Sequence, residues 1–551
     1  MSSRRPVDRS TEAAPGARGH GAAARWRILV VALGLAYVAF SLTHLGGAYW
    51  DSDEGLNLMK GRLFGLGYAL YDPMWSDQPP GYTGLLALAF AVAGPSVAAA
   101  RAVTFAFALL AMWAGARIAG ELGGGRPARV AAAAALALAP NFFWASRAAM
   151  IGLPALAMAA AAMAMALAYL AHGRRRDLAL AGLLLGLSCW VKLIGAYLVV
   201  PIGLAVWLRR RDVRVDRDGD DPLGPASRQD EVVRDVAALA LAIGLPLAAM
   251  LLAFDGRALF GQVVGTVVGA RGAEPLDVAW NAVKLADWGI ARDLGRPGWT
   301  FGDHAWLVAP ALAGLVVALR RRRDAGIVVG VWLGLTLIAL LLQNPLWPKH
   351  HFLALLVLMA PLAGLGIEWA TASLVAEWRA RAGSAAGSGA DVTFGVGLLG
   401  ALVIAAAVVP LPAAIRADVA RISAVPLKES GKLPSHSDSW LTLDEAVVFL
   451  RGHTQPGDWV VTDHAFVAFK ADRPVPPELA VISSKRVATG GLTAEEVIAV
   501  TRRRDAAAVL LWDGDRISGA FPAFVDWVRW NYDAVEGAPA GWALWLRKER
   551  P

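Results

Sequence analysis

The sequence predicts a mostly α-helical, polytopic membrane protein that ends in a small α/β domain. Three observations lead to this fold class. The chain of 551 residues is 56% hydrophobic and only 18% charged, with a mean hydropathy of +0.48, whereas soluble domains are about 45–50% apolar and about 25% charged. The apolar residues gather in runs of roughly twenty, the length that crosses hydrocarbon. From about residue 413 onward the composition becomes that of a soluble domain.

The first apolar run, 26–46, follows a disordered basic tail, 1–25, and lacks a small-residue cleavage site, so we expect a retained span within a membrane domain of residues 26–412. The run 81–94 is short for a crossing, and we expect a re-entrant or interfacial segment there. With it set aside, about eleven full transmembrane helices remain. After the first, they are predicted over 97–119, 128–144, 150–171, 177–191, 193–208, 236–254, 304–320, 325–342, 352–370 and 393–412.

Arginine clusters predict which side of the membrane each loop occupies. The clusters at 174–176, 209–211 and 320–323 should be cytoplasmic, together with the N-terminus. The loop 47–82 and the C-terminal domain then lie outside a cell (cytoplasmic) membrane. The net charge of +8 comes largely from these clusters, so membrane topology explains it better than a nucleic-acid partner does. Membrane lipids are expected partners, and no nucleic acid is. The single cysteine, Cys189, excludes an internal disulfide and a cysteine-based metal site.

The predicted C-terminal domain, 413–551, mixes helices and strands. Capping-box patterns begin at Thr442 and Thr493, each ahead of an apolar-periodic segment. Buried strands are predicted near 459–462, 507–511 and 542–546. We therefore expect a small extracytoplasmic α/β domain on the outer face.

Acidic residues are concentrated in the first external loop, 47–82. Asp51, Asp53 and Glu54 open this loop, and Asp77 comes shortly before Pro79 and Pro80. Carboxylates beside hydrocarbon are costly, so such a cluster suggests a function, although an acidic loop in an arbitrary membrane protein is more often only solvated. Isolated cations are predicted at the outer ends of other spans: Arg101, Arg147, Lys192, Lys349 and His350. Each alone reads as an interfacial anchor, but together they suggest an anionic ligand.

Four elements of the first 210 residues resemble a known superfamily. They are the Asp53-Glu54 pair, the Asp77-Gln78-Pro79-Pro80 segment, Arg101 in the next apolar stretch, and the Pro140 to Arg147 segment. This pattern resembles the GT-C glycosyltransferases, in the branch of protein O-mannosyltransferases and lipid A aminoarabinose transferases. Some of these relatives carry a basic residue or His directly before the Pro-Pro, where this chain has Gln78. We therefore expect cations elsewhere in the chain, rather than the residue at position 78, to bind the donor phosphate.

The resemblance implies a cell-membrane glycosyltransferase that moves a hexosyl or pentosyl unit from a polyprenyl-phosphate-linked sugar donor. The acceptor would be a protein, lipid or polysaccharide on the outer face. Asp53 is the expected general base, with Glu54 beside it in the catalytic pair; which of Asp51 and Asp53 matches the family's base stays open. Direct displacement would invert the anomeric centre. The expected substrate-binding residues are Asp51, Asp77, Arg101, Arg147, Lys192, Lys349 and His350.

Three alternatives remain at this stage. A divalent cation held by Asp53 or Glu54 could bridge to the phosphate, although nothing in the sequence requires one. A transporter or flippase of lipid-linked sugars would show internal repeats and polar groups near the midplane, and neither pattern stands out. A non-catalytic scaffold that presents the C-terminal domain would leave the outer cations unexplained.

Overall fold

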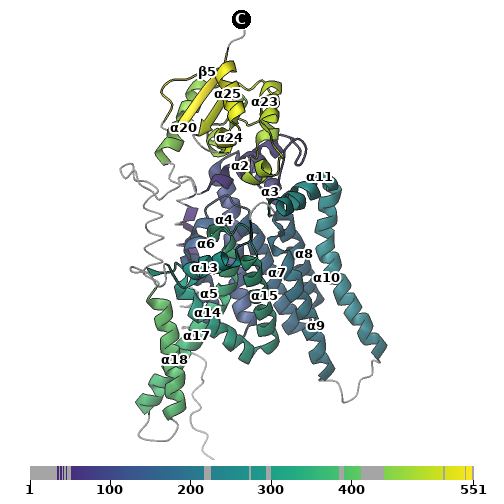
Figure 1. Cartoon of the computed structure of the whole chain (residues 1–551). Helices are drawn as coiled ribbons and strands as arrows, with labels where there is room; N and C mark the ends of the chain where they lie inside the picture. Colours follow the sequence, from purple (N-terminus) through teal and green to yellow (C-terminus); the bar gives the residue numbers. More distant parts are fainter. Residues whose placement is uncertain are drawn as a thin grey trace, which may run out of the picture. The chain divides into compact units, whose positions relative to one another are not determined.

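The computed structural model describes residues 51–215, 225–271, 275–292, 300–383, 390–410, 440–512, 516–539 and 541–548, with isolated positions between 31 and 45. The chain divides into two compact units, Met1–His44 and Leu45–Pro551. The predicted tail 1–25 and most of the first predicted span, 26–46, lie outside the described residues. The second unit contains the remaining helices and the C-terminal domain (Figure 1).

Each span predicted in this second unit coincides with a helix or with two consecutive helices. They are α4 (Val97–Glu121), α5 (Arg126–Leu138) with α6 (Pro140–Ala145), α7 (Gly152–His172), α8 (Arg175–Val191), η1 (Leu193–Leu198) with α9 (Val199–Val215), α10 (Pro225–Ala253), α14 (Ala305–Arg321), α15 (Arg323–Leu341), α17 (Leu353–Gly383) and α18 (Ala390–Val408). The helix α3 (Gly81–Ala93) has 13 residues. It is shorter than the roughly twenty residues of a full crossing, as predicted for the run 81–94.

Five helices in the described part of the chain are long and apolar enough to cross a membrane. They are Val97–Glu121, Gly152–His172, Glu231–Ala253, Arg323–Leu341 and Leu353–Arg381. The chain is therefore a multi-pass membrane protein. The number of eleven crossings and the interfacial position of α3 stay predictions.

The centre of the bundle is formed by α7 and α17, which are largely buried. Small residues let neighbouring helices approach closely, as in other membrane bundles. A Cβ atom added to Gly366 of α17 would lie 2.0 Å from the Pro310 carbonyl oxygen of α14. One added to Gly314 of α14 would lie 1.8 Å from the Leu362 carbonyl oxygen. These glycines therefore fix the contact between α14 and α17.

The acidic loop predicted over 47–82 contains a helix that the sequence did not reveal, α2 (Ser52–Gly65). Asp51 caps this helix, because its side chain accepts a hydrogen bond from the Asp53 backbone N–H at 3.0 Å. Leu58, Met59 and Leu63 are fully buried on one side of it. Burial against the rest of the chain thus stabilises a segment whose composition reads as polar.

The C-terminal domain is built on a four-stranded sheet with the order β3-β4-β6-β5. Strand β3 (Val460–Thr462) pairs parallel with β4 (Ala508–Trp512), and β6 (Trp542–Arg547) pairs antiparallel with both β4 and β5 (Tyr532–Ala534). The three predicted strands are confirmed, whereas β5 was not expected. The helices are α20 (Trp440–His453), α21 (Ala465–Lys470), α22 (Ser484–Ala488), α23 (Ala494–Arg503), α24 (Arg516–Ala520) and α25 (Pro522–Asn531).

The two predicted helix starts in this domain have different outcomes. Thr493 forms the capping box with Glu496, with both reciprocal hydrogen bonds present. The prediction at Thr442 is wrong, because α20 already begins at Trp440 and the threonine lies inside the helix. Residues 411–439 are outside the described part of the chain, so the domain boundary at 413 stays a prediction.

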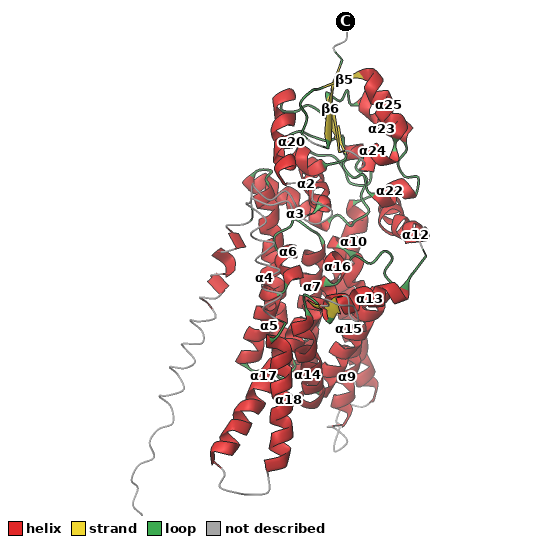
Figure 2. Ribbon diagram, turned by 60° about the vertical axis from the view of Figure 1, so that its left-hand side comes forward, coloured by secondary structure: helices red, strands yellow, loops and turns green. Residues whose placement is uncertain are grey.

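The C-terminal domain packs directly on α2 and α3, as both ribbon views show (Figures 1 and 2). One hydrophobic cluster includes residues of α2, α3 and the domain. The Phe90 and Phe469 rings lie 5.6 Å apart between centroids, and the Arg62 guanidinium lies 2.7 Å from the Asp472 carboxylate. The C-terminal domain is therefore in contact with the acidic loop, 47–82, and with α3.

Candidate active site

The first acidic residue, Asp51, connects the start of α2 with the segment before α17. Its carboxylate lies 2.9 Å from the Lys349 ammonium and 3.5 Å from His350 Nε2. Lys349 and His350 both belong to the short helix α16 (Pro348–His351). Asp51 is therefore in contact with residues almost 300 positions further along the chain. The substrate-binding roles of Asp51, Lys349 and His350 stay predictions.

Asp53 lies in the first turn of α2, where its side chain is exposed. Electrostatic interactions link its carboxylate to Lys60, Lys192 and His350, which come from three different segments. Burial lowers the pKa of His350, while Asp51 and Asp53 oppose that shift. Asp53 is thus an accessible carboxylate surrounded by basic side chains.

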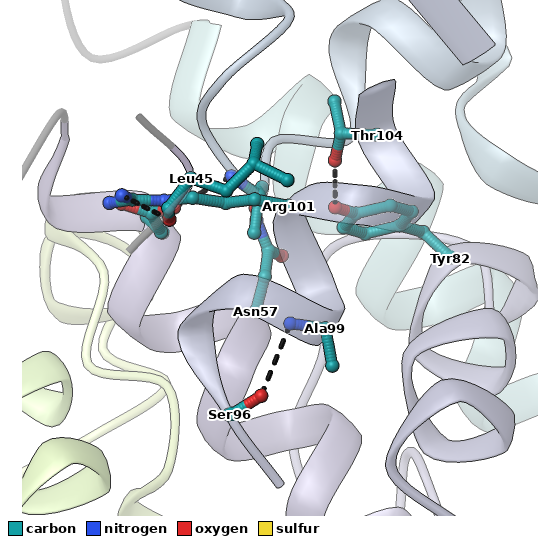
Figure 3. Close-up of polar contacts among 9 residues, drawn as sticks. Leu45, Asn57, Tyr82, Ser96, Ala99, Arg101 and Thr104 are labelled. Atoms are coloured by element: carbon teal, nitrogen blue, oxygen red, sulfur yellow. Dashed lines mark hydrogen bonds and ion pairs between the residues drawn. The ribbon is translucent and has the colours of Figure 1, made fainter. Parts of the chain in front are cut away.

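Glu54, the next residue, is completely buried and forms an ion pair with Arg101 of α4. The Arg101 Nε and Nη2 atoms donate to the two carboxylate oxygens at 2.7 and 2.8 Å, and both side chains are 0% exposed. Arg101 Nη1 also donates to the Leu45 carbonyl oxygen at 3.0 Å, and Figure 3 shows this residue beside Leu45. The Ala149 N–H donates to Glu54 Oε1 at 2.7 Å. Every charge in this pair is satisfied, as burial requires.

These contacts hold α2 against two other elements. Besides the bond to Glu54, Ala149 accepts a hydrogen bond from the Asn57 side-chain amide at 3.0 Å. On the neighbouring helices, the Tyr82 hydroxyl of α3 is hydrogen-bonded to Thr104 of α4 at 2.7 Å (Figure 3). The sequence predicted Glu54 as catalytic and Arg101 as substrate-binding; the structure brings the two together and buries them, so their described contacts serve to position α2.

The segment that follows α2 is held in one conformation by polar contacts. Gln262 accepts a hydrogen bond from the Ser76 N–H at 2.9 Å and donates to the Tyr71 carbonyl oxygen at 2.7 Å. The Tyr71 hydroxyl donates to the Gln78 carbonyl oxygen at 3.0 Å. Burial, reinforced by Asp77, raises the pKa of Tyr71, so this hydroxyl stays a neutral donor. Asp77 is consequently presented from an ordered loop.

Two lysines near this loop were missed by the sequence reading. Lys60 lies on α2 and is buried, with its ammonium 3.5 Å from the Ser76 hydroxyl. Lys485 comes from α22 in the C-terminal domain and lies 3.8 Å from the Asp77 carboxylate. Neither lysine stands out in the sequence, since Lys60 is one polar residue of an undetected helix and Lys485 is distant along the chain. The predicted cation Lys192 interacts electrostatically with Asp53, Asp77 and Lys485.

Arg147 lies in the turn between α6 and α7 and is fully buried. Its guanidinium donates to the Phe143 carbonyl oxygen at 3.0 Å and to the Ser146 hydroxyl at 3.1 Å, and it lies 3.7 Å above the Phe143 ring. These contacts fix the turn that carries Ala149. A substrate-binding role for Arg147 stays a prediction.

A cavity of about 400 Å³ adjoins Lys349. Lys349 therefore links the cavity to Asp51 and the start of α2. The walls of this cavity combine aromatic and charged side chains, as ligand sites commonly do. The lining residues are Asn141, Trp144, Lys284, Asp287, Trp288, Arg292, Asp303, Pro348 and Lys349.

The Asp53-Glu54 pair does not fit a shared metal ion. Both carboxylate oxygens of Glu54 already accept hydrogen bonds, and the group is enclosed by protein. Among the described residues, no group of three or more His, Cys, Asp or Glu side chains has the proximity to hold a metal. A bridging cation at this pair would require Arg101 to give up its partner.

Known proteins share part of the sequence and the fold of this chain. Residues 77–215 match the family model described as dolichyl-phosphate-mannose-protein mannosyltransferase. A comparison with curated protein sequences gave no match. The expected resemblance to the branch of mannosyltransferases and aminoarabinose transferases is thereby confirmed.

Solved structures support the fold over nearly the whole chain. The crystal structure of ArnT from Cupriavidus metallidurans bound to undecaprenyl phosphate matches with a TM-score of 0.57 at 13% identity, covering 94% of this chain and 97% of that chain. The apo state of the same protein matches with a TM-score of 0.56 at 13% identity, covering 95% and 98%.

Proposed function

We propose that the chain is a membrane glycosyltransferase that moves a hexosyl or pentosyl unit from a polyprenyl-phosphate donor to an acceptor on the outer face of the cell membrane. The observation that carries this proposal is the surrounding of Asp53. The exposed carboxylate of Asp53 interacts electrostatically with Lys60, Lys192 and His350. The neighbouring Asp51 contacts Lys349, which lines a cavity. Such a site offers a base and cations to one reaction.

The residues on either side of Asp53 hold it in place. Asp51 is fixed by Lys349 and by its capping bond, and Glu54 is fixed by Arg101 and the Ala149 N–H. A base that is already oriented needs little reorganisation when the substrate binds. Asp51 and Glu54 therefore act as positioning residues, and Asp53 is the residue proposed to touch substrate.

The proposed reaction is a direct displacement. Asp53 accepts the proton of the acceptor hydroxyl, whose oxygen attacks the anomeric carbon. The bond between that carbon and the phosphate oxygen breaks, and its electron pair leaves with the polyprenyl phosphate. The phosphate thereby gains negative charge, which Lys192 and the neighbouring cations stabilise. Attack from the side opposite the leaving group inverts the anomeric centre.

The comparisons support the donor class. The family model is named for a dolichyl-phosphate-linked sugar, and the ArnT structure contains undecaprenyl phosphate. Both are polyprenyl phosphates, so the same class is proposed here. The acceptor remains a protein, lipid or polysaccharide, because no described contact selects among these classes.

The orientation in the membrane is also part of the proposal. The arginine-rich turn between α14 and α15 is placed on the cytoplasmic side, as positive residues favour that side. The N-terminus is proposed to be cytoplasmic as well. The acidic segment and the C-terminal domain that packs on it then face the outside.

The direct test compares Asp53→Asn with Asp72→Asn. Asp72 is an exposed acid of the same loop and serves as the matched control. Purified proteins in lipid nanodiscs receive a panel of synthetic polyprenyl-phosphate sugars, and both bound donor and released polyprenyl phosphate are measured. We expect Asp53→Asn to bind donor like wild type and to lose about 10²–10⁴-fold in turnover, the usual contribution of a general base. Full turnover by Asp53→Asn would refute the assignment.

A further inference from the structure

One lysine of the C-terminal domain extends to the acidic loop. Lys485 is the second residue of α22, and its ammonium lies 3.8 Å from the Asp77 carboxylate. The lysine side chain is 41% exposed, whereas that of Asp77 is 12% exposed. A loose and partly exposed pair of this kind contributes little to stability. Lys485 can therefore exchange Asp77 for a stronger anion at small cost.

The backbone around Lys485 is fixed by its neighbour Arg486. The Arg486 guanidinium donates to the carbonyl oxygens of Glu478 and Gly491 at 2.8 and 3.0 Å. It also lies 5.3 Å from the centre of the Trp75 ring, two residues before Asp77. Arg486 thus attaches α22 both to its own domain and to the acidic loop, which holds Lys485 over Asp77.

Lys485 completes a patch of three lysines. Lys192 interacts electrostatically with Lys485, Asp77 and Asp53, and the buried Lys60 interacts with the same two carboxylates. The loop itself is held against the end of α8, where a Cβ atom added to Gly81 would lie 2.7 Å from the Trp190 carbonyl oxygen. Three lysines therefore interact with two carboxylates, one of which is the proposed base.

We propose that Lys485 and Lys192 bind the phosphate group of the polyprenyl-phosphate donor, so that the C-terminal domain supplies part of the donor site. Asp77 holds Lys485 until the lipid phosphate replaces it. This inference rests on the proposed function, because it names a ligand for the same reaction. It assigns a role to Lys485 that the sequence did not suggest.

Removal of the Lys485 ammonium should lower the affinity for polyprenyl phosphate, whereas removal of another surface lysine should not. The measurement is the affinity of full-length protein in nanodiscs for polyprenyl phosphate. Lys485→Ala should weaken binding by about 10- to 100-fold, as expected when one hydrogen bond to a charged group is lost, and Lys485→Arg should retain most of it. The matched control is Lys548→Ala, which removes a lysine of the same domain that is 47% exposed and 3.9 Å from Asp533.

A second variant gives an effect of the opposite sign. Asp77→Asn removes the carboxylate that competes with the phosphate for Lys485 and Lys192, so polyprenyl phosphate should bind more tightly. Lys485→Gln, which keeps the side chain long and polar without the charge, should behave like Lys485→Ala. Thermal unfolding of each variant shows whether it is folded.

Two additional ligands distinguish the source of the phosphate. Polyprenol, which lacks the phosphate, should bind wild type and Lys485→Ala equally, and inorganic phosphate should bind far more weakly than the lipid. If inorganic phosphate binds as tightly as polyprenyl phosphate, the site takes free phosphate and the lipid assignment fails. If Lys485→Ala binds polyprenyl phosphate as tightly as Lys548→Ala, the proposal is overturned.

Failure here is distinguishable from failure of the proposed function. Normal affinity in Lys485→Ala together with donor turnover by wild type would remove only the role of Lys485. Tight, Lys485-dependent binding without any turnover by wild type would instead refute the enzyme and leave the phosphate site.

Discussion

The ion pair between Glu54 and Arg101 separates two adjacent carboxylates into different roles. Asp53 is exposed and interacts electrostatically with basic side chains, while Glu54 is enclosed and bound through both oxygens. Breaking a buried ion pair by removing one charge leaves the other uncompensated, which costs about 3–5 kcal/mol. The pair therefore determines how firmly the start of α2 is held.

We expect Glu54→Gln to lower the free energy of unfolding by about 3–5 kcal/mol, because Arg101 remains buried with a neutral partner. Glu121→Gln is the control, since Glu121 pairs with the partly exposed Arg117 at 2.8 Å within α4 and should lose less than about 1 kcal/mol. Unfolding in mixed micelles measures both. Equal losses in the two variants would contradict a special role for the buried pair.

The lowered pKa of Lys60 leads us to expect that the affinity for polyprenyl phosphate depends on pH. Burial lowers its pKa from the ordinary value of 10.5, although Asp77 and Asp53 oppose the shift. The ammonium is charged below its pKa and neutral above it, so a positive charge is lost as the pH rises, earlier than for an exposed lysine. The affinity for polyprenyl phosphate should therefore fall as the pH rises through the pKa of Lys60. Lys60→Met should lack this fall in affinity. If the affinity of Lys60→Met falls over the same pH range as that of wild type, another group causes the fall.

At this residue scale the sequence identified the acids but not their roles. Asp51, Asp53, Glu54 and Asp77 stand out because acidic residues are unusual beside apolar runs. Which carboxylate stays accessible depends on Arg101 from α4 and on α16, and these are contacts between distant parts of the chain. A single sequence does not contain that information.

Among the elements, α2 shows where local patterns fail. Its composition reads as a polar loop, and its helical structure depends on burial against α3 and the C-terminal domain. The helices of the membrane domain, by contrast, were predictable because they coincide with apolar runs in the sequence. In the C-terminal domain, β5 is three residues long and was missed, while β3, β4 and β6 were predicted.

The contact between α2 and α21 is close enough to be tested with a single methyl group. A Cβ atom on Gly55 would lie 2.4 Å from the Phe466 backbone nitrogen. We expect Gly55→Ala to cost about 1–3 kcal/mol of stability through overpacking and to reduce donor turnover, because the start of α2 shifts. Gly84→Ala in α3 has no atom within 4 Å of the added group and should be neutral or slightly stabilising. Similar behaviour of the two variants in thermal unfolding would disprove the close contact.

At the scale of the whole molecule, the arrangement favours an enzyme over a carrier. Carriers bind substrate near the middle of the membrane between repeated halves. Here the acidic loop, Lys192 and Lys485 meet where the C-terminal domain packs on α2 and α3. A domain that contributes a lysine to the site also makes a passive scaffold a poor explanation.

The most direct test follows the oxygen atoms of the cleaved bond. Wild-type protein in nanodiscs is given a polyprenyl-phosphate sugar in ¹⁸O-labelled water without an acceptor, so that water replaces the acceptor hydroxyl. Mass spectrometry then locates the label. Glycosyl transfer predicts ¹⁸O in the released sugar and none in the polyprenyl phosphate, because the bond at the anomeric carbon breaks. Label in the phosphate would indicate hydrolysis at phosphorus and would contradict glycosyl transfer.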